Sequence, residues 1–194
     1  MTESAMSPGA GIAVILFVVI MIVALVLVFA SRYKKVPPNK AMVVYGRRMG
    51  GGKGYIIVSG GGKFIMPIVE QYAFLPLEVR TLEFDLDSVT VDTIGGPRKA
   101  RIRATAMYKI GSDPAVLEIA AEQLLGKPDE EIEKIARDIL EGAIRELLTS
   151  LDFEKVSNDR DAVALGIHQR ASSTLMNMGL EIRAFTFKEL ALKG

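Results

Sequence analysis

The chain has 194 residues, and its 24 lysine and arginine residues nearly balance its 23 aspartate and glutamate residues, which gives no indication of nucleic-acid binding. The absence of cysteine excludes disulfides, thiolate metal sites, a cysteine nucleophile and palmitoylation. The single histidine, His168, argues against a histidine-rich metal site.

An uninterrupted apolar segment covers residues 11–30, after a short N-terminal stretch of residues 1–10. An α-helix of this length spans ~30 Å, the hydrocarbon thickness of a bilayer. The alternative is a cleavable signal peptide cut after Ala30, but the apolar run is too long and residues 1–10 carry no basic side chain. We therefore predict a retained transmembrane helix. Its membrane-spanning side chains include Ile12, Phe17, Ile22 and Phe29.

Basic residues gather directly after this span, in a proline-containing segment at 31–40 that we interpret as a linker. They are Arg32, Lys34, Lys35 and Lys40. The positive-inside rule places this side in the cytoplasm and residues 1–10 outside, which predicts a single-pass protein of the cell membrane. Two roles stay open for these charges: binding anionic lipid head groups, or acting only as determinants of topology.

Two glycine triplets, Gly50–Gly52 and Gly60–Gly62, each precede a lysine in the next part of the chain. Neither fits a phosphate-binding loop, because the required earlier glycine is missing, no Ser or Thr follows Lys53 or Lys63, and no helix pattern begins there. We interpret the glycines as permitting tight reversals between short strands near the membrane.

Alternating apolar and polar residues predict a mostly antiparallel sheet from residue 41 onward. The Gly95–Pro97 turn signal joins the two clearest strands, and Pro67 marks an edge or loop. The predicted strands are 41–45, 55–58, 64–69, 81–87, 89–92, 99–110 and 180–187.

A helical period of 3.6 residues begins at Asp113, where Asp-Pro predicts an N-cap followed by proline at the first helical position. Three helices are predicted: 113–125, 128–148 with a continuous apolar stripe, and 159–178 ending at Gly179. Strands followed by helices and a last strand indicate an α+β domain.

The polar residues offer few candidates for chemistry. Glu83, Asp85 and Asp87 form a carboxylate row that is able to bind a divalent cation, but we favour a solvated strand face opposite Arg101 and Arg103. His168 and Ser172 lie four residues apart on a predicted helix without a third catalytic member. We therefore expect no enzyme activity, metal or cofactor. A membrane-tethered hydrolase using His168 is the enzyme-class alternative.

Four segments of the chain carry a resemblance to a known family. They are PPNKAMVVYGR, GGGKFIMPIVEQYAFLPLEVRTLEFDL, EQLLGKPDEEIEKIARDILEGAIRELLTSLDFEKVSNDR and MNMGLEIRAFTFKEL. The third segment is the most specific, because it resembles the flotillin helix pair joined by Leu125-Gly126-Lys127. Residues 36–190 resemble the SPFH or band 7 superfamily of stomatins, prohibitins and flotillins, and within it the flotillins.

The resemblance implies an SPFH domain at 41–190 that is not an enzyme. It implies a scaffold that forms homo-oligomers on the bilayer and organises membrane microdomains and their proteins, without binding nucleic acid. The alternative is a regulatory subunit that binds a membrane protease or transporter. The resemblance also implies that apolar loops near the start of the domain touch the membrane interface, with packing into the core as the alternative. The candidate loop residues are Phe64, Ile65, Met66 and Ile68.

Two departures from the flotillin pattern affect these expectations. The lack of cysteine removes palmitoyl anchoring, so we expect the helix at 11–30 to hold the protein alone. Residues 191–194 lie where flotillins continue into a long coiled coil, and we interpret them as the truncated start of a possible coiled coil. Two alternatives stay open: the chain is a truncated form, or it is a short relative.

Overall fold

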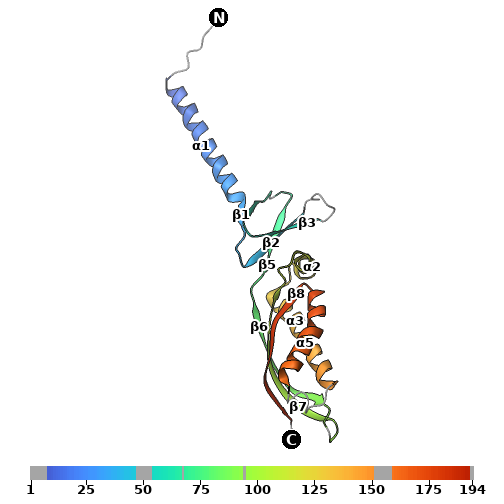
Figure 1. Cartoon of the computed structure of the whole chain (residues 1–194). Helices are drawn as coiled ribbons and strands as arrows, with labels where there is room; N and C mark the ends of the chain where they lie inside the picture. Colours follow the sequence, from blue (N-terminus) through green and yellow to red (C-terminus); the bar gives the residue numbers. More distant parts are fainter. Residues whose placement is uncertain (1–7, 47–53, 67, 94, 151–158, 193–194) are drawn as a thin grey trace.

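The computed structural model describes residues 8–46, 54–66, 68–93, 95–150 and 159–192. The molecule is elongated: one helix projects at one end, a small group of strands follows it, and a larger body of strands and helices reaches the C terminus (Figure 1). This mixed arrangement confirms the α+β class predicted from the sequence.

Helix α1 (Pro8–Arg32) contains the predicted membrane span. Its segment Gly11–Arg32 has 22 residues and a mean hydropathy of 3.7, and none of its most apolar window is buried against the rest of the protein. The helix ends at Arg32 because strand β1 (Tyr33–Lys35) begins at the next residue. The predicted linker at 31–40 is therefore partly helix and partly strand, which corrects that interpretation.

Two small antiparallel sheets follow α1, one with the order β1-β4 and one with the order β3-β2-β5. The segment 64–69, which we predicted as a strand, is mostly loop, because only Phe64 belongs to a strand. The strands are β2 (Lys40–Tyr45), β3 (Tyr55–Ser59), β4 (Gly62–Phe64) and β5 (Gln71–Pro76).

Two glycines lie at the break between β3 and β4, where the chain keeps its direction because both strands run antiparallel to the consecutive strands β1 and β2. Gly60 and Gly61 have φ angles of +86° and +74°, a region that disfavours residues with a Cβ atom. The predicted tight reversal is therefore wrong at this second triplet: the positive φ angles of Gly60 and Gly61 mark a local bend between two strands of the same direction, and Gly62 already belongs to β4. The first triplet, Gly50–Gly52, lies outside the described residues.

Strand β2 joins two cores because both of its faces are buried. Ala41 and Val43 pack with Leu75 in the main hydrophobic core. Met42 and Val44 belong to a second, smaller core on the side of α1. The small sheet is therefore held from both sides, and the part of the domain next to α1 is packed against the rest.

A larger sheet, in the order β6-β7-β8, forms the body of the domain. Its inward side chains include Leu82, Phe84 and Leu86, as the alternation predicted. The predicted strands 81–87 and 89–92 form one strand with a bulge between Leu86 and Val89. The strands are β6 (Arg80–Val91), β7 (Arg98–Ile110) and β8 (Leu180–Leu192).

The outer face of this sheet carries the carboxylate row, which forms ion pairs across the strands. Arg101 donates to both carboxylate oxygens of Asp85, at 3.0 and 2.8 Å, and Arg103 lies 3.3 Å from the same carboxylate. Hydrogen bonding from Arg101 lowers the pKa of Asp85, and hydrogen bonding from Lys188 lowers the pKa of Glu83. The preferred interpretation of a solvated, charge-paired strand face is confirmed.

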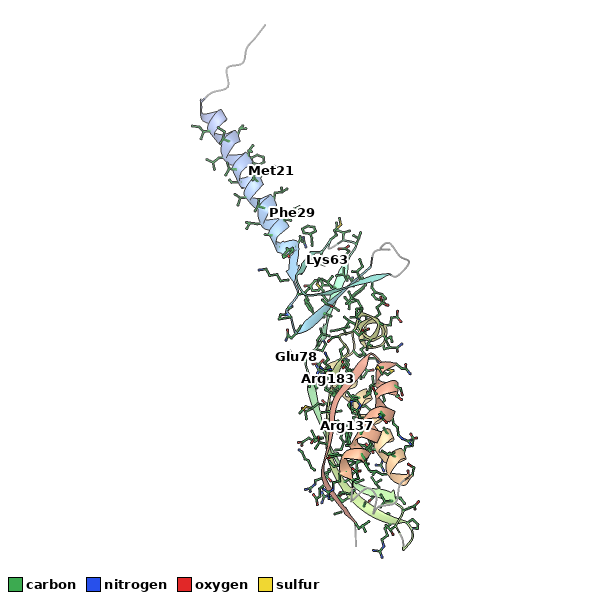
Figure 2. The ribbon with its side chains drawn as sticks, viewed as in Figure 1. Met21, Phe29, Lys63, Glu78, Arg137 and Arg183 are labelled. Atoms are coloured by element: carbon green, nitrogen blue, oxygen red, sulfur yellow. The ribbon has the colours of Figure 1, made fainter. Side chains whose placement is uncertain are left out.

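Helices α2 (Pro114–Leu124), α3 (Asp129–Thr149) and α5 (Arg160–Met176) pack on the domain. The α3 stripe is buried as predicted, with Leu140 and Ile144 fully inaccessible to solvent. These helices cover one face of the large sheet (Figure 1). Arg137 of α3, labelled in Figure 2, links this helix to β6, because it donates to the Glu83 carbonyl oxygen at 2.8 Å.

Helix α2 connects the body of the domain to the small sheet. Asp113 caps it by accepting a hydrogen bond from the Ala115 amide at 3.0 Å, as the Asp-Pro pattern predicted. The Tyr55 hydroxyl on β3 donates to the Glu122 carboxylate at 2.8 Å. Burial, and then this hydrogen bond, raise the pKa of Tyr55 to about 12.

The end of the described chain differs from its prediction. Ala191 and Leu192 belong to β8 and pair with Arg101 and Ala100 of β7. They are strand residues because the sheet continues past the predicted end at residue 187, so the predicted coiled-coil start is wrong for these two positions. Residues 193–194 lie outside the described residues.

We predict that Gly179→Ala destabilises the protein far more than Gly60→Ala. Both glycines have positive φ, so each substitution loses roughly 1–2 kcal/mol from backbone strain. A Cβ at Gly179 would also lie 2.3 Å from the Ala120 Cα atom, whereas nothing lies within 4 Å of one at Gly60. The free energy of unfolding, measured with urea on the full chain in detergent micelles, should fall by about 1–3 kcal/mol more for Gly179→Ala. Equal losses would contradict this close packing of α2 on the turn between α5 and β8.

Candidate functional site: a juxtamembrane face

The end of α1 and the small sheets form a surface that combines apolar and basic side chains. We call it the juxtamembrane face. It consists of Arg32, Lys34, Lys35, Lys40, Phe64, Met66, Ile68, Val69, Tyr72 and Phe74.

The length of the span fixes the depth of this face. Twenty-two helical residues at ~1.5 Å each cover ~33 Å, slightly more than the hydrocarbon thickness of a bilayer. Arg32, the last residue of α1, would therefore lie at the level of the lipid head groups. The strands that begin at Tyr33 follow it immediately, so the juxtamembrane face starts at that same level.

The base of α1 is fixed to the domain by several contacts. The rings of Phe29 and Phe64 lie 4.8 Å apart between centroids, and the Ile65 amide donates to the Arg32 carbonyl oxygen at 3.1 Å. In Figure 2 Phe29 lies on α1 and Lys63 on the adjoining strand, with the two elements meeting between them. Gly62 permits this approach, because a Cβ there would lie 2.5 Å from the Tyr33 hydroxyl oxygen.

The predicted interface loop has both exposed and buried members. Phe64, Met66 and Ile68 are exposed, with Met66 at 47% and Ile68 at 96%. Ile65 is only 5% exposed, because it packs in the second core with Val36. The candidate set for membrane contact is corrected accordingly: Ile65 anchors the loop from inside, and the other three side chains face outward.

Basic side chains and aromatic rings alternate across the same face. The Lys34 ammonium lies 5.9 Å from the Tyr72 ring centroid, and the Lys40 ammonium lies 5.9 Å from that of Phe74. The two rings meet edge to face at 5.6 Å. A lysine over an aromatic ring keeps its charge at the border of an apolar surface. Arg32 and Lys35, the other predicted head-group residues, are exposed beside them.

Sequence reasoning missed the two aromatic residues of β5. Tyr72 and Phe74 occur in the run QYAFLP, where the alternate positions are Gln71, Ala73 and Leu75, so that only the first of them is polar. Their spacing was the available signal, since residues two apart share one face of a strand.

A cavity of about 480 Å³ opens beneath the face, where α1 meets β2 and β5. It is lined by Ser31, Arg32, Lys34, Tyr45, Ile65, Glu70, Gln71 and Tyr72. Glu70 is 7% exposed, and its carboxylate accepts a hydrogen bond from the Met66 amide at 3.0 Å. The cavity therefore has cations on its α1 side and a buried carboxylate on the side of the loop.

The pair of residues considered for a hydrolase lies on α5, apart from the juxtamembrane face. His168 and Ser172 are half-buried on α5, as their spacing suggested, and no third catalytic partner joins them in the described contacts. No group of three or more metal-binding side chains occurs among the described residues.

Comparison with known proteins gives the family. The model of the SPFH domain / Band 7 family matches residues 34–193. The flotillin-like protein FloT of Bacillus subtilis is 33% identical over 178 residues, which are 88% of this chain and 34% of FloT. Human flotillin-1 is 32% identical over 154 residues, 79% of this chain and 35% of the relative.

Goldfish (Carassius auratus) flotillin-2 is similar to the same extent, at 32% identity over 156 residues, with 80% of this chain and 35% of the relative covered. The chain thus spans about a third of the length of the curated relatives it matches. The match to the domain model covers both the juxtamembrane strands and the body behind them. The chain belongs to the SPFH/band 7 family and is flotillin-like.

Proposed function

We propose that this protein is a membrane-anchored, non-catalytic scaffold that forms homo-oligomers and organises membrane microdomains and their proteins. The observation that carries the proposal is the fixed junction between an exposed apolar span and a flotillin-like domain. Such a junction holds the domain at one distance from the bilayer. That is useful to a protein that gathers lipids and membrane proteins beside it.

The juxtamembrane face supports direct contact between the domain and the bilayer. Met66 and Ile68 are large, apolar and exposed, next to a helix that itself enters the membrane. Exposed apolar groups bordered by cations are typical of surfaces that enter the interfacial region of a bilayer. We propose that Phe64, Met66 and Ile68 insert there, with Arg32, Lys34, Lys35 and Lys40 facing lipid phosphates.

A single tryptophan tests this contact, because the natural chain contains none. We predict that Ile68→Trp in the full chain, reconstituted in bilayer nanodiscs, fluoresces at a blue-shifted wavelength and is quenched by lipids brominated near the head group. The matched control is Leu165→Trp on α5, another exposed apolar position, which should emit as in water. Unquenched emission from Ile68→Trp would show that the loop does not enter the membrane.

The orientation has its own test, because the natural chain has no cysteine. We propose that the domain faces the cytoplasm, since the basic residues follow the span. A membrane-impermeant maleimide applied to intact cells should label Ser4→Cys and leave Ser173→Cys, on exposed α5, unlabelled until the cells are opened. Labelling of Ser173→Cys in intact cells would reverse the topology.

Assembly is the third expectation of the scaffold proposal. The full chain, extracted with its surrounding lipid into polymer nanodiscs, should form particles containing many copies, visible by electron microscopy. Chemical crosslinking in membranes before extraction should give the same copy number, which controls for loss of subunits. Particles with one copy in both measurements would remove oligomerisation from the function of these 194 residues.

A further inference from the structure

We propose that the cavity beneath the juxtamembrane face binds the head group of a phospholipid that carries a primary ammonium group. The proposal deepens the membrane contact proposed above and rests on it. Its basis is the arrangement of opposite charges in one cavity of about 480 Å³: Arg32 and Lys34 on one side and the buried Glu70 on the other.

Glu70 is the feature of this cavity that most needs an explanation. Among the described residues, it is the one charged side chain that is buried. Its carboxylate accepts one backbone hydrogen bond, from Met66, and no described Lys or Arg forms an ion pair with it. A buried carboxylate is costly unless a cation or several donors compensate it. A ligand ammonium entering the cavity would supply that compensation.

The opposite side of the cavity suits a phosphate. Arg32 ends the membrane span, and Lys34 follows it on β1. A guanidinium group recognises phosphate oxygens through paired N–H donors, and an ammonium adds a point charge. Tyr45 and Tyr72 line the same cavity as these cations and Glu70. Aromatic rings of this kind favour a cationic ligand group beside them.

The position of the cavity relative to the bilayer favours a lipid as the source of this ligand. Ser31 and Arg32, which line it, are the last two residues of α1 and thus reach the head-group level. A phosphate and an ammonium in one small group match the two charged sides of the cavity. A lipid with only a phosphate and hydroxyl groups would leave the Glu70 carboxylate uncompensated.

A structural role for Glu70 is the competing explanation. Its carboxylate and backbone both contact Met66: the Glu70 amide donates to the Met66 carbonyl oxygen at 2.8 Å, which closes a tight turn. Glu70→Gln separates the two explanations. The glutamine amide oxygen still accepts the bond from the Met66 amide, but the negative charge is gone.

The experiment measures lipid binding to the full chain in detergent by native mass spectrometry. The probes are phosphatidylethanolamine and phosphatidylglycerol with identical acyl chains. We expect the natural chain to bind phosphatidylethanolamine about tenfold more tightly than phosphatidylglycerol, because one charge-assisted contact contributes about that factor in affinity. Glu70→Gln should bring the two affinities within about twofold. Arg32→Gln should weaken both lipids by a similar factor.

Two outcomes would overturn the proposal. One is equal affinity of the natural chain for the two lipids. The other is a preference for phosphatidylethanolamine that survives Glu70→Gln. The matched control is Glu130→Gln, which removes an exposed carboxylate on α3 outside the cavity lining and should preserve the preference. Thermal unfolding of Glu70→Gln, compared with the natural chain, checks that the turn is intact.

A further arm distinguishes the lipid from a soluble ligand. Glycerophosphoethanolamine has the same head group without acyl chains. If it displaces phosphatidylethanolamine at equal concentration, the ligand is a soluble metabolite and the lipid proposal fails. Its failure to compete supports recognition at the bilayer.

Failure of this inference would not be mistaken for failure of the scaffold proposal. Quenching of Ile68→Trp and the formation of multi-copy particles can both be measured in bilayers that contain no phosphatidylethanolamine. Both results should persist there if only the head-group proposal is wrong. Loss of both in every bilayer would contradict the scaffold proposal itself.

Discussion

The end of the apolar run of α1 at Arg32 is the constraint on which the rest of the structure depends. The apolar residues before it have no favourable environment outside lipid, and the basic residues after it have none within lipid. That boundary determines that β1 begins at Tyr33. Because β1 starts there without a spacer and pairs with β4, hydrogen bonds fix the end of α1 relative to the sheet.

The double-sided burial of β2 carries this constraint further into the domain. One face of the strand packs with Ile65 and Val36 toward α1, and the other packs with Leu75 in the main core. A tilt of the helix would therefore disturb two cores at once. The Tyr55–Glu122 hydrogen bond adds a link from the small sheet to α2. Packing contacts are thus continuous from the end of α1, through the small sheet, to the helices of the domain, unlike in a domain joined by a flexible linker.

The sequence predicted those parts of the fold whose signals are local. The α3 stripe, the Asp113 cap and the alternation of Leu82, Phe84 and Leu86 each depend on neighbours in the chain, and each was confirmed. Elements that depend on distant partners were harder to predict. β5 was missed because its apolar run lacks polar alternation, and β8 extends to Leu192 because β7 continues to pair with it.

The juxtamembrane loop shows the same limit within a few residues. Ile65 and Ile68 are chemically identical and flank a proline, so no periodic pattern assigns them to different environments. The β1–β4 pairing does so, because it places Ile65 directly after a hydrogen-bonded strand and turns its side chain into the second core. Ile68 is exposed because it lies in the turn itself, together with Val69. Strand pairing determines burial here, and pairing between distant segments cannot be predicted from a short stretch of sequence.

The same reasoning separates this face from a simple basic tail. A disordered polybasic segment attracts lipids through its number of charges, and its affinity changes little when one lysine moves. Here Lys34 and Lys40 are held over the rings of β5, and Glu70 is buried beneath them. Charges of both signs therefore have fixed positions relative to the end of α1. Charged groups held in such positions can distinguish one head group from another. Selectivity arises when a charge of the ligand meets an opposite charge of the protein in one position and no opposite charge in any other position.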